Sequence, residues 1–219
     1  MDNNAVKQFI EIAMKYVGVT EKPLGSNRGA QIDEWNTAVG VPVGSFWCAS
    51  FVSAIARKWE AQTGLDFPLV GSASCDSWLQ QARKKQMLTR IAKPGRILLV
   101  MKDGDVNDAI HIGICGYEAN GTISSIEGNS NNDGSANGTM VAWRRNHLWN
   151  RSALNVYYID WMKDMDKDWT VEVNGKDIDT KVIDDTVYVP VRAVARALDI
   201  PITVQLDEKH IIVEEKKAD

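Results

Sequence analysis

Cys48 is the residue of this chain best placed for covalent chemistry. It follows a Gly/Ser loop in the segment Val43–Val52 and opens a stretch with the apolar period of a helix. A thiol in a first helical turn lies near unpaired backbone N–H groups and the positive end of the helix dipole, which favour the nucleophilic thiolate. Cys48 is therefore a candidate nucleophile. Taken alone, it is equally consistent with a small buried apolar side chain.

A cysteine nucleophile needs a base, and the chain has three histidines. His111 lies in an alternating β-type run, Ile110–Cys115, which places His111 and Gly113 on one face and three isoleucines on the other. We expect Gly113, which has no side chain, to leave room for a nucleophile beside the imidazole. His147 follows a basic run at a strand end, where we expect a surface role, and His210 lies in the tail. His111 is the candidate base; a core histidine bonded to backbone is the alternative.

The third member of such a site is expected on a neighbouring strand. Glu127 ends a β-type run, and Asn129 follows just past it. A carboxylate or amide that holds one imidazole nitrogen fixes the tautomer, so that the other nitrogen can take the cysteine proton. The joint pattern favours covalent catalysis by a thiol, although Glu127 by itself is also consistent with an exposed acid. Cys115, on the predicted His111 face, is expected to be a structural thiol, with a place in the wall of the site as the alternative.

The composition is typical of a soluble globular protein. The 219 residues are 44% hydrophobic and 25% charged, enough for one ordinary domain and a small one. Nucleic-acid binding is not expected, because the net charge is -4 and nucleic-acid-binding domains are typically basic. The three cysteines show no metal-ligand spacing, so we expect free thiols. No run approaches about 18 consecutive apolar residues, so no membrane insertion is expected.

The elements that must position these residues predict an α+β fold. Helices are expected over residues 4–17, around Ile32 and Trp35, from Cys48 onward, and after a cap at Ser74 or Asp76. The expected strands then cover residues 96–101, 110–117, 122–126, 140–144 and 155–161. The dipeptide at 120–121, Asn-Gly, is typical of a hairpin turn. Helices followed by short strands indicate helices packed on an antiparallel sheet.

The chain is predicted to contain two domains. Residues 1–161 form the first, and residues 162–168 are charged, lack a buried period and are interpreted as a linker. Residues 169–219 are predicted to form a small ββαββ domain. Its expected elements are strands over 169–173 and 186–189, a helix over 192–198, and a closing hairpin of 202–205 with 210–214.

The order of Cys48, His111 and Glu127 with Asn129 resembles the CHAP family, the cysteine, histidine-dependent amidohydrolase/peptidase domains related to NlpC-type and papain-like peptidases. The matching segments are Ser26–Gly29, Trp47–Val52, Pro94–Leu98, His111–Ile114 and Glu127–Asn131. The resemblance implies a papain-like fold with helices packed on an antiparallel sheet. It further implies that Cys48 is the nucleophile, His111 the general base and then acid, and Glu127 and Asn129 the orienting groups.

The family resemblance implies a peptidoglycan hydrolase that cleaves an amide bond of the bacterial cell wall. The enzyme is expected to be either an N-acetylmuramoyl-L-alanine amidase or a peptide endopeptidase. Some family members carry an Asp-rich calcium loop before the cysteine helix, but residues 39–45 hold no acids, so no metal or other cofactor is expected. A catalytically inactive cell-wall-binding module and a thiol acyltransferase on the same fold remain as alternatives.

The tail resembles a second family, the small domain similar to the amino-terminal domain of copper amine oxidases. Residues 173–176 and 187–195 carry this match. Copper is not expected, because the tail holds one histidine, His210, and no cysteine. The expected role is wall binding or protein contact, with a plain folding unit as the alternative.

The expected setting is a phage or prophage endolysin. The first residues lack a basic region followed by an apolar run, so we expect synthesis in the cytoplasm without a signal peptide and release to the wall at lysis. The expected partner is bacterial peptidoglycan. We assume a monomer.

Overall fold

Four helices and a six-stranded antiparallel sheet form the part of the computed structural model that contains the candidate site. The structure describes residues 3–103, 105–131, 138–144 and 155–163, and, in the tail, 170–173, 176–179, 181–183, 186–188, 193–194, 196, 198, 202–206 and 211–215. The chain divides into two units, Asn3–Asp164 and Met165–Asp219. None of the described helices is long and apolar enough to cross a membrane.

The helices lie where the apolar periods predict them. They are α1 (Asn3–Met14), α2 (Ala30–Ala38), α3 (Cys48–Thr63) and α4 (Cys75–Lys84). α1 ends three residues before the predicted Val17, and residues 15–18 continue as a turn. α3 begins at Cys48, as predicted, and is closed by Gly64, whose φ of 74° is a left-handed conformation that glycine adopts without strain.

Ser74 caps α4 and thereby fixes the first turn that carries Cys75. Its hydroxyl accepts a hydrogen bond from the backbone N–H of Ser77 at 3.2 Å, so the prediction of Ser74 as a cap is confirmed. The alternative cap, Asp76, instead accepts from the backbone N–H of Ala109 at 2.7 Å and ties the helix to the sheet.

Replacing Ser74 with alanine is expected to lower the free energy of unfolding by about 1 kcal/mol, because an orphan N–H of the first turn loses its acceptor. Chemical denaturation of the purified protein measures this change. Ser74→Asp is the matched control, since aspartate caps a helix equally well and should retain most of the stability. A stability loss of the same size in both variants would contradict a capping role.

The sheet brings together strands that are distant in sequence. Its order is β1-β6-β2-β3-β4-β5, and all neighbours pair antiparallel. The strands are β1 (Leu88–Thr89), β2 (Ile97–Lys102), β3 (Asp105–Ala119), β4 (Thr122–Ser130), β5 (Met140–Arg144) and β6 (Val156–Ile159). The predicted α+β class is confirmed at this level. The two-residue strand β1 was not predicted, because so short a run has no period.

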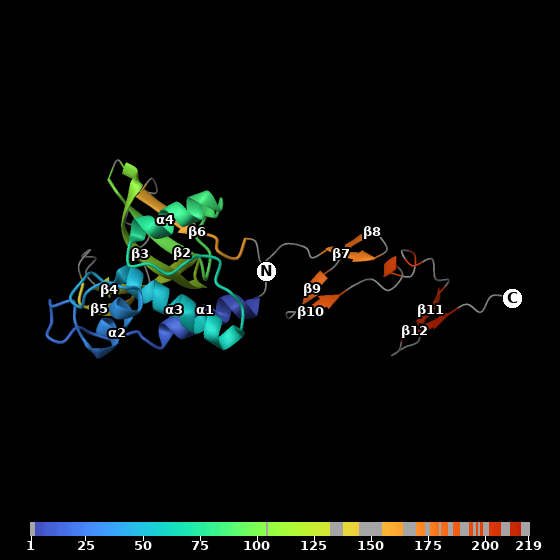
Figure 1. Cartoon of the computed structure of the whole chain (residues 1–219), viewed down its shortest axis with the longest axis horizontal. Helices are drawn as coiled ribbons and strands as arrows, with labels where there is room; N and C mark the ends of the chain where they lie inside the picture. The colour runs from blue at the N-terminus through green and yellow to red at the C-terminus, as the bar shows by residue number, and fades with distance from the viewer. Residues whose placement is uncertain are drawn as a thin grey trace. The chain divides into compact units, whose positions relative to one another are not determined.

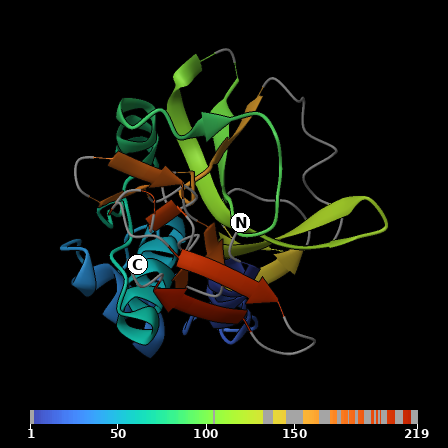
Figure 2. The same ribbon diagram turned by 90° about the vertical axis from the view of Figure 1, so that its right-hand side faces the viewer.

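The hairpin of β3 and β4 carries two of the candidate site residues. Its turn, Asn120-Gly121, has positive φ angles of 53° and 73°, which are those of the predicted tight turn. Figure 2 shows this hairpin in yellow-green, extending from the sheet. In Figure 1, α1, α2 and α3 gather along one side of the sheet, and α4 lies apart from them beside β3.

Buried aromatic rings pack the helices against one another and against the segment that follows β6. One group centres on Trp161, whose ring lies 4.9 Å from that of Phe9 and 5.1 Å from that of Trp59. A second group surrounds the start of α3, where the Trp35 ring lies 5.9 Å from Trp47 and 5.4 Å from Phe51. Stacked and edge-on pairs of this kind add to the apolar burial. The residues that flank Cys48 are therefore fixed in the core.

The described residues of the second unit form three two-stranded antiparallel sheets. They pair β7 (Thr170–Val173) with β8 (Lys176–Asp179), β9 (Lys181–Ile183) with β10 (Thr186–Tyr188), and β11 (Ile202–Leu206) with β12 (Ile211–Glu215). The closing hairpin was predicted. Two further strands, β8 and β9, were not predicted. The tail thus has six described strands where ββαββ predicts four.

The predicted linker lies only partly in the described chain. Met162 is buried, and the Lys163 ammonium donates to the backbone carbonyl of Gln86 at 2.9 Å, so both residues pack with the first unit. Residues 164–168 lie outside the described residues.

Candidate active site

Cys48 is held at the first turn of α3 by its neighbours on both sides. The preceding Trp47 is fully buried, and its indole N–H donates to Glu21 Oε1 at 3.0 Å. Gly128 of β4 lies against the same turn, since a Cβ there would be 2.6 Å from Phe51 Cβ. A glycine at this point lets the strand approach the helix closely. Cys48 itself is buried, with 8% of the residue exposed.

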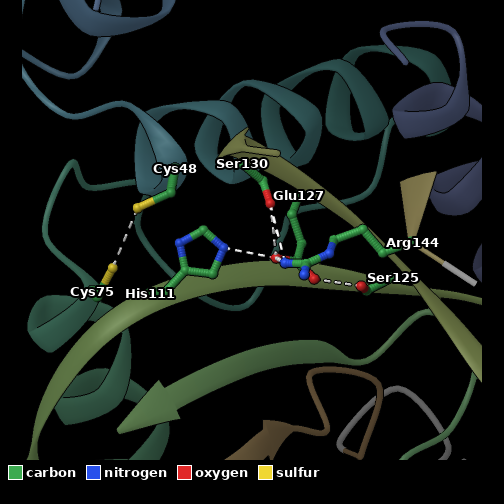
Figure 3. Close-up of polar contacts among 7 residues, drawn as sticks. All are labelled: Cys48, Cys75, His111, Ser125, Glu127, Ser130 and Arg144. Atoms are coloured by element: carbon green, nitrogen blue, oxygen red, sulfur yellow. Dashed lines mark hydrogen bonds and ion pairs between the residues drawn. The ribbon is translucent and has the colours of Figure 1, made fainter. Parts of the chain in front are cut away.

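The imidazole of His111 lies between a carboxylate and the cysteine sulfur. Its Nε2 is 2.9 Å from Glu127 Oε2. The other ring nitrogen, Nδ1, is buried, has no hydrogen-bond partner among the described residues, and is directed towards Cys48 Sγ, as Figure 3 shows. A carboxylate on Nε2 fixes the ring so that Nδ1 serves the sulfur. The structure thus brings together Cys48, His111 and Glu127.

Glu127 is the electrostatic anchor of the site. Its Oε2 is 3.3 Å from the guanidinium of Arg144 and accepts from the hydroxyl of Ser130 at 3.4 Å, and its Oε1 accepts from the hydroxyl of Ser125. Burial by itself would raise the pKa of Glu127. His111, Arg144 and Ser125 outweigh burial and lower this pKa to about 2. The carboxylate is therefore charged, and the predicted alternative of an exposed strand-end acid is wrong, since Glu127 is 1% exposed.

The sulfur and the imidazole favour each other's charged forms. The pKa of Cys48 lies well below its ordinary 9.0, chiefly because the Cys75 thiol stabilises the thiolate. Burial acts in the opposite direction and raises this pKa. His111 and the backbone of Ala49 lower it further. Burial opposes protonation of His111, but Cys48 and Glu127 together raise its pKa to about 10. Both shifts therefore favour the thiolate–imidazolium form of the pair.

Cys75 belongs to the site and was not predicted to do so. Its Sγ lies 3.7 Å from Cys48 Sγ, within hydrogen-bonding distance for sulfur, and it comes from the first turn of α4. Its pKa is raised well above 9.0, first by the Cys48 thiolate and then by burial. Cys75 therefore stays protonated and donates to the thiolate. The contact depends on how α3 and α4 pack, which the sequence does not reveal.

Asn129 occupies a strained position beside the site. It lies at the register shift between Glu127 and Ser130, has a φ of 50°, and is 1% exposed. Its Oδ1 has no hydrogen-bond partner in the described part of the chain. The contact with Nε2 of His111 comes from Glu127. An orienting role for Asn129 stays a prediction.

Gly113 does not leave room for a nucleophile beside His111, so that expectation was wrong. A Cβ at Gly113 would lie 2.6 Å from Cγ of Glu127 and 3.2 Å from the carbonyl oxygen of Ile126. The missing side chain therefore makes room for the carboxylate, not for a nucleophile. Gly113 lets β3 and β4 place Glu127 against the ring of His111.

Gly113→Ala is expected to lower the rate of the amide hydrolysis that the sequence predicts for this site by about 10-fold or more. The added methyl group displaces Glu127, which then no longer holds the imidazole of His111 in its productive orientation. Gly116→Ala on the same strand is the matched control. Its Cβ would meet the hydroxyl of Ser124 at 2.4 Å, away from His111. Both rates are measured on the folded fraction. Equal losses in the two variants would show that crowding of the hairpin, and not the position of Glu127, sets the rate.

The remaining sequence candidates lie outside this constellation. Cys115 is fully buried among apolar residues that include Val100 and Tyr158, and burial raises the pKa of its thiol, so it is a structural thiol. His147 and His210 lie outside the described residues. Among the residues that the structure describes, no group of three or more His, Cys, Asp or Glu side chains is arranged to hold a metal ion.

Comparison of the chain with protein-family models, with curated proteins and with solved structures gives no match. The function is therefore argued from the geometry of the site and from the motifs in the sequence.

Proposed function

We propose that this protein is a cysteine-dependent hydrolase that cleaves an amide bond of bacterial peptidoglycan. One observation carries the thiol chemistry: the ring of His111 is bound through Nε2 to a buried carboxylate and turns Nδ1 towards the sulfur of Cys48. A nucleophile, a base within reach and a group that orients the base form the arrangement of acyl-transfer enzymes. The finer fold that we propose for the first unit is papain-like.

The catalytic cycle follows from the charges in the resting site. The Cys48 thiolate attacks the amide carbonyl carbon, and backbone N–H groups of the first turn of α3 are placed to stabilise the oxyanion that forms. The protonated His111 then gives its proton to the leaving amine, which leaves a thioester on Cys48. Neutral His111 next takes a proton from water, and the resulting hydroxide releases the acid. Glu127 stays ionised and holds the ring throughout.

The peptidoglycan substrate is supported by the CHAP-like motifs of the sequence. Of the segments that carry the resemblance, Trp47–Val52 contains the nucleophile and Glu127–Asn131 the orienting acid. We further propose that residues 169–219 bind the wall or a wall protein, and that the protein acts as an endolysin. Either the bond between muramic acid and the stem peptide or a bond within the peptide fits this chemistry.

Purified bacterial cell walls test the proposal. The protein is expected to reduce the turbidity of a wall suspension and to release fragments with one new amine and one new carboxylate for each cut, which mass spectrometry identifies. The position of the new amine distinguishes an amidase from an endopeptidase. Protein alkylated beforehand with iodoacetamide is the control and should be inactive. Walls that keep all their amide bonds but retain the protein would overturn hydrolysis in favour of a wall-binding module.

A further inference from the structure

The catalytic cycle leaves one nucleophilic group of the site unused. Cys75 contributes a second thiol at 3.7 Å from the sulfur of Cys48, and both residues begin a helix, α4 and α3 respectively. Each is held by the backbone hydrogen bonds of its helix, so the contact is built into the fold. Their exposed fractions are 8% for Cys48 and 9% for Cys75, and a molecule as small as a peroxide needs little access.

We propose that Cys48 and Cys75 form a redox modification site, in which hydrogen peroxide converts the two thiols into a reversible disulfide that blocks the nucleophile. The distance supports this pairing. A disulfide requires about 2 Å between sulfurs, so closing the gap from 3.7 Å takes less than 2 Å of movement, within the range of a side-chain rotation. The disulfide itself does not depend on the proposed function; the loss of wall hydrolysis does.

The chemistry balances in two steps. The Cys48 thiolate attacks one oxygen of hydrogen peroxide, the O–O bond breaks, and hydroxide leaves, so that Cys48 becomes a sulfenic acid. The Cys75 sulfur then attacks the Cys48 sulfur, an S–S bond forms, and the S–O bond breaks. The leaving oxygen takes up the Cys75 proton and ends as water, and the hydroxide released in the first step takes a proton from the solvent and becomes the second water. The two sulfurs lose two electrons to the peroxide.

The site makes Cys48 the attacking thiol and Cys75 the resolving one. Cys48 reacts first because its surroundings lower the pKa of its thiol, whereas the pKa of the Cys75 thiol is raised. The negative charge that raises the pKa of Cys75 comes mainly from the Cys48 thiolate, and it disappears when Cys48 becomes a sulfenic acid. The nearby imidazolium of His111 then faces no thiolate, which favours ionisation of Cys75. Oxidation of the first sulfur thus activates the second.

Cys115 provides an internal comparison. It is fully buried in the apolar cluster with Leu98, Val100 and Tyr158. Within the described part of the chain, no second thiol lies within hydrogen-bonding distance of Cys115, and burial raises the pKa of its thiol. We expect it to stay reduced when the pair reacts.

The test is to treat the full chain with hydrogen peroxide and to analyse it by non-reducing peptide mapping and intact mass. The expected product is lighter by two hydrogen atoms, contains a peptide pair cross-linked through Cys48 and Cys75, and returns to the starting mass with dithiothreitol. Cys115→Ala should give the same cross-link. In Cys75→Ala, Cys48 should gain two oxygens as a sulfinic acid that dithiothreitol does not reverse.

Oxidised wild-type protein that carries sulfinic acid at Cys48 without a cross-link, or that links either residue to Cys115, would overturn the proposal. Wall hydrolysis, measured in parallel, should fall to the level of the alkylated protein and recover with dithiothreitol. If the cross-link forms but the reduced protein never hydrolyses walls, the disulfide stands and the proposed function fails, so the two results are separable.

Discussion

Cys48→Ala is expected to lower wall hydrolysis by at least about 10³-fold, because the reaction loses the atom that forms the thioester. The fold should survive, since alanine fits the first turn of α3 and the burial of Trp47 and Phe51 is untouched. Turbidity loss of purified walls and quantified fragment release measure the rate.

Cys115→Ala is the matched control for this prediction. It removes an equally small, buried thiol, but from the apolar cluster of the sheet and not from the site. Its rate should stay within a few-fold of the wild type, at a small cost in stability. Comparable hydrolysis by Cys48→Ala and the wild type would exclude the thiol mechanism.

Glu127→Gln is expected to lower the rate by about 10²-fold or more and also to destabilise the fold. The amide keeps the shape of the carboxylate but loses the charge that holds His111 protonated, so the pKa of His111 should fall and less Cys48 should be thiolate. The substitution also removes the charge that pairs with the buried guanidinium of Arg144 at 3.3 Å, so the free energy of unfolding should fall. Denaturation and wall hydrolysis report the two effects separately.

The matched control is Glu118→Gln, which changes the same functional groups at an exposed position of β3. Stability and rate should both stay close to the wild type, because an exposed surface charge contributes little.

The pH dependence of the free energy of unfolding also tests the charge of Glu127. Because folding lowers this pKa from 4.5 to about 2, its stabilising contribution is present above pH 4.5 and is lost as the pH falls towards 2. The Glu127→Gln variant should not show this loss of stability at low pH.

The local parts of the site could be predicted from sequence. The helix that begins at Cys48 follows from its apolar period, and the hairpin follows from Asn120-Gly121. The alternation of β3 placed the His111 side chain on one face of the sheet. Chain order then suggested that Glu127 and His111 are neighbours, and the antiparallel pairing of β3 with β4 does bring them together.

The parts that failed depend on packing between elements. Nothing within the segment around Cys75 indicates that α4 would bring its first turn against that of α3. Arg144 reaches Glu127 from β5 because β3, β4 and β5 pair side by side. From sequence alone, an arginine at this position is typical of a solvated surface. Gly113 was recognised as a gap in a side-chain row, but the residue that fills the gap, Glu127, is known only from the register of the two strands.

We expect Cys48 to be a thiolate at neutral pH, because Cys75 and His111 stabilise its charge. The pH dependence of iodoacetamide alkylation, followed at Cys48 by mass spectrometry, measures the thiolate directly. We predict a midpoint well below pH 9.0 in the wild type and a higher midpoint in His111→Gln. A midpoint at or above 9.0 that is the same in both proteins would contradict it.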